Sequence, residues 1–146
     1  MKIDLGCGRN KPVGYFGVDC QDFPGVDLVC DANEILPLQD NIADEVRAFD
    51  FLEHVRNDCR IHIMNEIWRI LKPGGILISK TPSTDGRGAF QDPTHYSFWN
   101  EQSFLYYTND TYRALYKSIV AKFEIISIST KESDVIKVLA TLKAIK

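Results

Sequence analysis

Two glycines and an aspartate near the start of the chain have the types and spacing of a ligand site. The segment Lys2-Ile3-Asp4-Leu5-Gly6-Cys7-Gly8 indicates a short strand that breaks into a glycine turn. Because Gly6 and Gly8 carry no Cβ, the backbone of this turn can approach a ligand closely. Asp19 ends a second apolar run, where a carboxylate can accept hydrogen bonds from a ribose diol. The pattern predicts a cofactor that contains a nucleoside.

The residues after the turn argue against a dinucleotide. A dinucleotide fingerprint continues to a third glycine that opens a helix, whose N-terminus faces the pyrophosphate. Residues 9–14 contain a proline and a glycine and are too few for a crossover helix. NAD and FAD, and with them a nicotinamide-dependent oxidoreductase, are therefore disfavoured.

Strand and helix signals alternate through the first half of the chain, which predicts a doubly wound, mostly parallel α/β sheet. Strands are expected over residues 2–5, 15–19, 27–30, 44–49 and 75–80. A helix is expected over 58–71, ended by Pro73-Gly74-Gly75. Its apolar residues recur at three- and four-residue steps: Ile61, Met64, Ile67 or Trp68, and Leu71. Residues 32–42 have almost no helix signal, so the helices after the first strands are reduced.

The second half of the chain has a different character. Residues 81–100 form a predicted loop that is too long for a simple connection and contains Phe90, Tyr96, Phe98 and Trp99, so it is a candidate binding segment. A helical stretch over 101–117, interrupted at 108–110, follows. Residues 123–128 and 135–140 predict an antiparallel hairpin at the end of the sheet.

Length and composition set further bounds. The 146 residues, 45% of them hydrophobic, fit one domain over 1–146. A net charge of −3 disfavours nucleic acid or a membrane surface as partner. The four cysteines lack metal-ligand spacing, so we expect buried free thiols and no metal site. No segment has the pattern of a leader or a membrane span, which predicts a cytoplasmic protein.

Five motifs in order resemble those of class I S-adenosylmethionine-dependent methyltransferases, and most closely the type 11 methyltransferase-domain group. They are Asp4-Leu5-Gly6-Cys7-Gly8, Asp19, Asp31-Ala32, residues 43–55 and Leu71-Lys72-Pro73-Gly74-Gly75. The order carries the specificity, because each motif alone is weak. The resemblance implies a Rossmann-like fold, S-adenosylmethionine as cofactor and methyl transfer as activity.

The resemblance also implies roles for single residues. Gly6, Cys7 and Gly8 would pass beneath the methionine end of the cofactor, and Asp4 would orient the turn and the cofactor's ammonium. Asp19 would bind the ribose, and the pair Asp31 and Ala32 would meet the adenine. For each aspartate a plainer role stays open: Asp4 bonded to loop amides, Asp19 ending a turn, or Asp31 capping one.

The end of the fourth strand supplies further candidates. In the family this segment lines the methionine and the sulfur, so Phe49 and Phe51 would pack on the cofactor, where an aromatic face favours the sulfonium charge. His54 matches a histidine found at this position in type 11 domains. Either ring is equally compatible with the core, and His54 with a packing role.

The chain also departs from the family pattern. Asn10 replaces the third glycine of the turn, the helix after the first strand is missing or vestigial, and no helix precedes Met1. We therefore expect an open cofactor pocket that a partner subunit of a homo-oligomer or an ordered loop completes.

The acceptor side is predicted in the long loop, at Asp92-Pro93-Thr94-His95-Tyr96. Methyl transfer needs alignment, and it needs a base only for a hydroxyl or ammonium acceptor. His95 would be that base with its ring held by Asp92, or the two would only fix the loop. Similar segments occur in relatives of unassigned or sugar-modifying function, so the expected substrate is a small molecule such as a sugar. The alternative is a non-catalytic cofactor-binding or interaction module.

Overall fold

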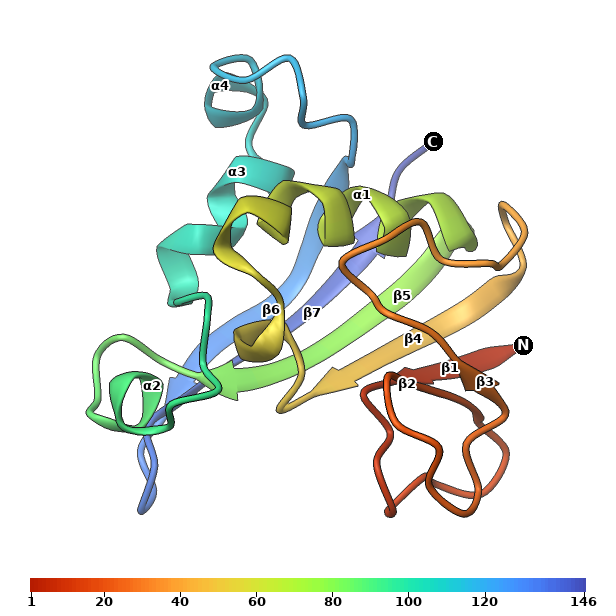
Figure 1. Ribbon diagram of the computed structural model, residues 1–146. Helices are drawn as coiled ribbons and strands as arrows, with labels where there is room; N and C mark the ends of the chain where they lie inside the picture. The colour runs from red at the N-terminus through yellow and green to blue at the C-terminus, as the bar shows by residue number, and fades with distance from the viewer.

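The computed structural model describes residues 1–146, which form a seven-stranded sheet with helices packed against it (Figure 1). The strands are β1 (Lys2–Leu5), β2 (Phe16–Asp19), β3 (Leu28–Val29), β4 (Ala43–Phe49), β5 (Leu71–Pro82), β6 (Phe123–Lys131) and β7 (Lys137–Ala144). The α-helices are α1 (Arg60–Ile70), α2 (Gly88–Gln91), α3 (Leu105–Thr108) and α4 (Asp110–Arg113). Short 3-10 helices are η1 (Leu52–His54), η2 (Asn57–Cys59) and η3 (Glu101–Phe104).

The strand order is β3-β2-β1-β4-β5-β7-β6, and the predicted doubly wound, mostly parallel arrangement is confirmed. The pairs from β3 through to β5 are parallel, whereas β7 pairs antiparallel with both β5 and β6. The predicted C-terminal hairpin is therefore confirmed. β5 begins at Leu71, four residues before the predicted start, because the chain leaves α1 directly in extended backbone.

The core lies between the sheet and α1. Ile63, Met64, Ile67 and Ile70 of this helix are all fully buried. The predicted apolar stripe is thus correct at Met64 and Ile67, while Ile63 takes the buried position expected for Ile61. The helix begins two residues later than predicted, after the 3-10 turn η2, and positions the segment between β4 and α1 at the edge of the sheet.

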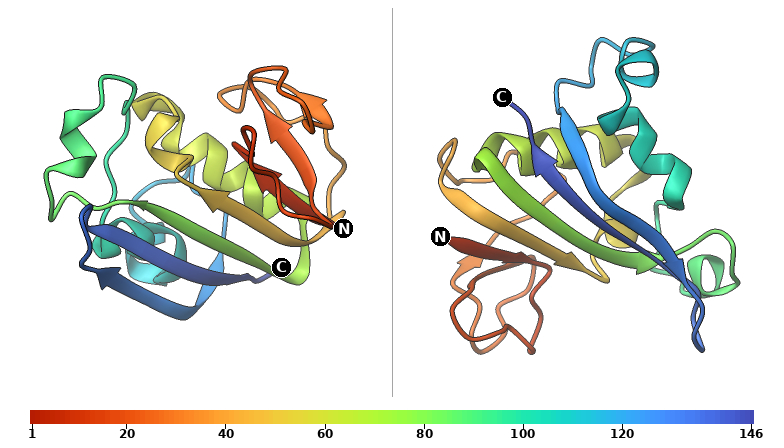
Figure 2. Two further views of the ribbon diagram at one scale, coloured as in Figure 1. Left: turned by 90° about the horizontal axis from the view of Figure 1, so that it is seen from below. Right: turned by 180° about the vertical axis from the view of Figure 1, so that it is seen from behind.

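The opposite face of the sheet has no helix across β4, β5, β7 and β6 in the view from behind (Figure 2). No helix joins β1 to β2 or β2 to β3, so the predicted reduction of the early helices is confirmed. Long charged side chains cover part of this face instead. Arg47 and Lys80 lie over the ring of Phe49, 4.1 and 4.8 Å from its centroid, and shield it from water.

The segment after β3 is fastened to α1 by one arginine. The guanidinium of Arg69 donates to the carbonyls of Leu38 (2.7 Å) and Leu36 (3.0 Å). It also pairs with Glu66 at 2.7 Å, and Glu66 accepts the N–H of Leu36 at 2.8 Å. Because Leu36 is 1% exposed, these bonds hold an apolar anchor in the core where a longer helix is absent.

We expect Glu66→Gln to lower the free energy of unfolding by about 1–3 kcal/mol at pH 7, as loss of a charged hydrogen bond does. Burial raises the pKa of Glu66, but the bonds from Arg69 and Leu36 outweigh it and leave the pKa lowered. A lowered pKa stabilises the fold above the unfolded value of about 4.3, and this contribution is lost as pH falls through the folded value. Urea unfolding at pH 7 and at acid pH measures both effects; the variant should lose less stability on acidification than the parent chain.

Short helices replace the long one predicted over 101–117, and the last of them ends at Arg113. The predicted interruption is a helix cap: Asn109 Oδ1 accepts the N–H groups of Thr111 and Tyr112 at 2.9 and 3.2 Å.

Trp99, one of the candidate binding aromatics, is fully buried and donates through Nε1 to Ser97 Oγ (3.0 Å). It anchors the long loop to the core. No helix of the protein has the length and apolar character that crossing a membrane requires.

Candidate functional site

A cavity of about 540 Å³ opens at the carboxyl ends of β1, β2 and β4. The strand order reverses between β1 and β4, and open α/β sheets bind ligands at such switch points. Six of the ten residues predicted to bind the cofactor line this cavity: Gly6, Asp19, Asp31, Ala32, Phe51 and His54. The fold thus brings residues from four separate segments to one hollow.

The glycine turn is held against the end of β2. Gly6 and Gly8 have φ angles of +67° and +52°, a left-handed conformation that favours glycine. The N–H of Gly6 donates to the Val18 carbonyl at 2.8 Å. A Cβ on Gly6 would lie 2.7 Å from Cδ2 of Phe51, which is closer than side chains pack. Gly6 therefore combines a left-handed backbone with direct contact to the cavity wall.

Asp19 joins the turn to the cavity. Its Oδ2 accepts the N–H of Gly8 at 2.8 Å, and its Oδ1 accepts the N–H of Gln21 at 3.0 Å. Each carboxylate oxygen has a further lone pair available to a ligand. Asp19 both ends the strand and lines the cavity, so the two roles left open by the sequence are compatible.

Asp31 also has two roles: its side chain stabilises a turn, and it lines the cavity. Its Oδ1 accepts both the backbone N–H (2.9 Å) and the side-chain amide (2.7 Å) of Asn33. Asn33 Oδ1 in turn accepts the N–H of Arg56 at 2.9 Å. This chain of bonds fixes the loop after β3 against the segment that precedes α1. Asn33 lines the cavity, and sequence reasoning missed it.

Four of the predicted cofactor residues do not line the cavity. Asp4 is buried and pairs with Arg47 at 2.8 Å, and Phe49 lies beneath Arg47 and Lys80 on the uncovered face of the sheet. Side chains alternate along a strand, which directs both residues away from the cavity. Cys7 packs on Gly17, and Gly8 acts through its N–H to Asp19. Asp4 and Phe49 therefore do not line the cavity, and the cofactor contacts expected of them stay predictions.

The cysteines are all free, as expected, but they are not all buried. Cys7 and Cys59 are buried, Cys30 is half-buried and Cys20 is exposed. Cys20 and Cys30 both line the cavity, at the ends of β2 and β3. The expectation of buried thiols is therefore wrong for Cys20.

A second hollow, of about 240 Å³, adjoins the first and shares Asp50 and His54 with it. It brings together residues from the end of β4, the long loop and β7. Asp50 has a φ of +49° and pairs with Lys137 (2.5 Å) and Lys80 (3.5 Å), so it ties β4 to β5 and β7 beneath the hollow. Asp92 and His95, the predicted catalytic residues, both line it.

The geometry of His95 and Asp92 differs from the predicted one. His95 Nδ1 lies 3.1 Å from the Ala89 carbonyl, which can only accept a hydrogen bond, so Nδ1 carries the hydrogen. Asp92 Oδ2 lies 3.8 Å from Nε2, the opposite nitrogen. The carbonyl of Ala89, and not Asp92, therefore orients the ring. Asp92 Oδ1 accepts both hydrogen bonds of Thr94 (2.8 and 2.6 Å), which lower the pKa of Asp92 and fix the loop.

Glu53 is the main residue of this hollow that sequence reasoning missed. It is 2% exposed and accepts a hydrogen bond from Thr81 Oγ1 at 2.5 Å. Burial raises the pKa of Glu53 above its ordinary value. The carbonyl of Glu53 accepts the N–H groups of Tyr96 and Ser97, which fixes the long loop over the hollow. The sequence contained one signal for this role: Glu53 is a charged residue that stands between apolar residues and His54 at the end of a strand.

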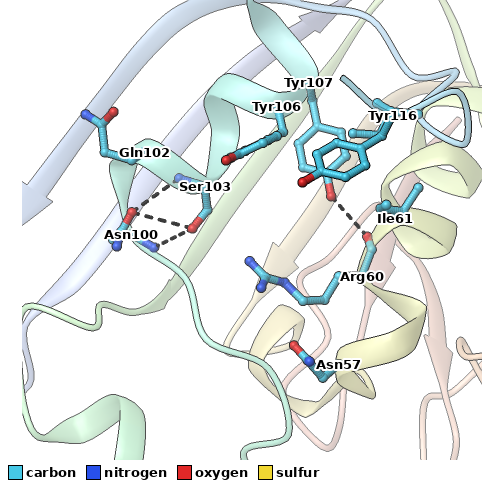
Figure 3. Close-up of a pocket in the computed structure, with 10 residues that line it drawn as sticks. Asn57, Arg60, Ile61, Asn100, Gln102, Ser103, Tyr106, Tyr107 and Tyr116 are labelled. Carbon is cyan, nitrogen blue, oxygen red and sulfur yellow. Dashed lines mark hydrogen bonds between the residues drawn. The ribbon is translucent and has the colours of Figure 1, made fainter. Parts of the chain in front are cut away.

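A further hollow, of about 450 Å³, lies away from the strand ends, between the start of α1 and the short helices that follow the long loop (Figure 3). Tyr106, Tyr107 and Tyr116 line it on one side and Arg60 on the other. The Arg60 guanidinium lies 4.7 Å from the centroid of the Trp99 ring. None of the predicted site residues lines this hollow, so we do not include it in the candidate site.

The strand order, the antiparallel final strand pair and the cavity at the switch point define the fold class of the S-adenosylmethionine-dependent methyltransferases. The chain belongs to the type 11 methyltransferase-domain family, whose model matches residues 3–79. It is therefore an S-adenosylmethionine-dependent methyltransferase with S-adenosylmethionine as cofactor. No curated protein sequence matches the chain.

Solved structures extend the similarity in fold to nearly the whole chain. A methyltransferase from Methanosarcina mazei is 18% identical with a TM-score of 0.71, over 99% of this chain and 92% of that one. One from Archaeoglobus fulgidus is 15% identical with a TM-score of 0.74, over 97% and 85%. The 1,6-didemethyltoxoflavin-N1-methyltransferase of Burkholderia thailandensis, solved with bound 1,6-didemethyltoxoflavin and S-adenosylhomocysteine, is 15% identical with a TM-score of 0.69, over 99% of this chain and 71% of that one.

Proposed function

We propose that residues 1–146 act as one methyltransferase domain that methylates a small molecule bound in the second hollow. The observation that carries this proposal is the junction of the two hollows, which share Asp50 and His54. A cofactor in the larger cavity and an acceptor in the second hollow would meet at these residues. Proximity of this kind is the main contribution a protein makes to transfer of an activated methyl group.

The larger cavity suits the cofactor in size and chemistry. Its volume of about 540 Å³ falls within the range of roughly 300–1,000 Å³ that small-ligand pockets occupy. Asp19 has lone pairs for the ribose diol, Asp31 and Ala32 lie where the adenine would, and Gly6 lines the cavity where the methionine end would lie. When bound, S-adenosylmethionine supplies a methyl group on a sulfonium and leaves as a neutral thioether.

We expect Asp19→Ala to weaken binding of S-adenosylhomocysteine about 10- to 100-fold, the effect of losing a hydrogen bond to a charged group. The carboxylate would no longer accept from the ribose or hold the Gly8 N–H. Calorimetric titration measures the affinity. Asp22→Ala is the matched control, since Asp22 lies in the same exposed loop and does not line the cavity. Equal affinities for the two variants would contradict the ribose-binding role.

The lining of the second hollow supports a small acceptor over a nucleic acid. Asp50, Glu53 and Asp92 contribute carboxylates, and the one lysine, Lys137, is already paired with Asp50. An anionic phosphate backbone would meet repulsion here. His95 Nε2 has a lone pair in the neutral ring, because Nδ1 donates to Ala89, and can take a proton from a hydroxyl or ammonium acceptor.

The test is a two-part measurement on the purified chain. Calorimetry with S-adenosylmethionine, S-adenosylhomocysteine and NAD should give saturable binding of the first two alone. Methyl-labelled S-adenosylmethionine and a small-molecule metabolite panel should then yield a labelled product. Cofactor binding with no labelled product would support the non-catalytic module instead, and labelling of nucleic acid alone would contradict the small-molecule acceptor.

A further inference from the structure

A buried carboxylate without a cationic partner lies in the wall of the second hollow. Thr81 Oγ1 donates to Oε2 of Glu53 and the backbone N–H of Glu53 also stabilises the carboxylate, but no lysine or arginine pairs with the group. A buried carboxylate is costly unless it is protonated or meets a cation. A cationic group of a ligand would supply the missing partner.

Two imidazoles add acceptors to the same space. His54 Nδ1 lies 3.0 Å from the carbonyl oxygen of Thr94. In the same way, His95 Nδ1 lies 3.1 Å from the carbonyl oxygen of Ala89. Since a carbonyl only accepts, each neutral ring keeps its Nε2 lone pair for a ligand. One carboxylate oxygen of Glu53 and one nitrogen of each histidine lie within 4.8 Å of one another. Three acceptor groups thus converge on the hollow.

The spacing of these groups is that of the acceptors around an ammonium. An ammonium with hydrogen bonds of about 2.9 Å holds its acceptors roughly 4.7 Å apart. Tetrahedral Zn²⁺ with ligands at about 2.0–2.1 Å needs them only roughly 3.4 Å apart. Acceptor atoms that all lie within 4.8 Å of one another can surround an ammonium as they stand, and the experiment below tests the metal ion as the other outcome.

We propose that the methyl acceptor is an amine of a small molecule, and that Glu53, with His54 and His95, binds its ammonium group. This inference rests on the proposed function and names its acceptor atom. The ammonium gives one proton to His95 Nε2, and the lone pair so freed forms the bond to the methyl carbon. The carbon–sulfur bond breaks with its electron pair left on sulfur, and the product is a methylated ammonium.

The chemistry of the product gives the first test. The purified chain is incubated with carbon-13 methyl-labelled S-adenosylmethionine and a deproteinised metabolite extract, and the products are separated on a cation exchanger. We expect the label on nitrogen, by carbon-13 NMR, in a retained fraction. Label on oxygen or carbon would overturn the amine acceptor and leave the proposed function intact. Cofactor binding without any labelled product would overturn both.

A variant tests the role of Glu53 itself. Glu53→Gln keeps the shape and the acceptor for Thr81 but removes the charge, and should lower kcat/KM for the labelled amine about 10- to 100-fold. Affinity for S-adenosylhomocysteine should not change, and the Tm should stay the same or rise because a buried charge without a cationic partner is removed, whereas a merely structural role would lower the Tm. Glu34→Gln, on an exposed turn, is the control. An unchanged kcat/KM in Glu53→Gln, or activity that requires added Zn²⁺ and is lost on chelation, would overturn the proposal.

Discussion

Replacing His95 by alanine is expected to lower the rate of methyl transfer by about 10²–10⁴-fold, the usual contribution of a general base. The change removes the Nε2 lone pair at the second hollow, while the wall of the larger cavity keeps all its residues. Affinity for S-adenosylhomocysteine should therefore match that of the parent chain. Single-turnover transfer of the labelled methyl group, together with calorimetry, separates the two quantities.

His62→Ala is the matched control for this experiment. His62 lies on α1 and contacts the carbonyl of Glu34 at 2.9 Å, outside both hollows. Its variant should retain the parent rate. His95→Gln adds a second check, because glutamine can still donate to Ala89 without supplying a base. Full activity in His95→Gln would show that His95 only positions the loop, the plainer role that the sequence left open.

Replacing Gly6 by alanine should destabilise the fold by about 2–5 kcal/mol and weaken cofactor binding as well. A left-handed residue with a Cβ costs about 1–2 kcal/mol, and forced overlap in a packed site costs a further 1–3 kcal/mol or so. The new methyl group would lie 2.7 Å from Cδ2 and 3.1 Å from Cβ of Phe51. Since the Cβ of Phe51 is fixed to the main chain, the cavity wall must move with it.

Gly14→Ala separates the two contributions. Gly14 has a φ of +84°, and a Cβ there would meet nothing within 4 Å. This variant should show the backbone cost alone in a urea unfolding curve, with unchanged affinity for S-adenosylhomocysteine. If Gly6→Ala and Gly14→Ala cost the same stability and both bind the cofactor normally, the contact between Gly6 and Phe51 does not shape the site.

The sequence alone determined the class of fold and the cofactor. The alternation of short apolar strands with reduced connections predicted the sheet, and the glycine turn with Asp19 predicted a nucleoside ligand. These features are local: a strand ends where glycine permits a left-handed turn, and side chains at the ends of parallel strands meet at one edge. Local patterns of this kind can be recognised in the sequence without knowledge of long-range contacts.

Only the tertiary structure decided which side chains face the hollows. Asp4 and Phe49 belong to matching motifs, yet the pleat of β1 and β4 turns them toward Arg47 and Lys80 on the other face. Glu53 became a candidate site residue only in the folded chain, where Thr81, which is remote in sequence, donates a hydrogen bond to its buried carboxylate. Strand register, loop closure and burial depend on the whole chain, and they set which groups meet and which charges lack a partner.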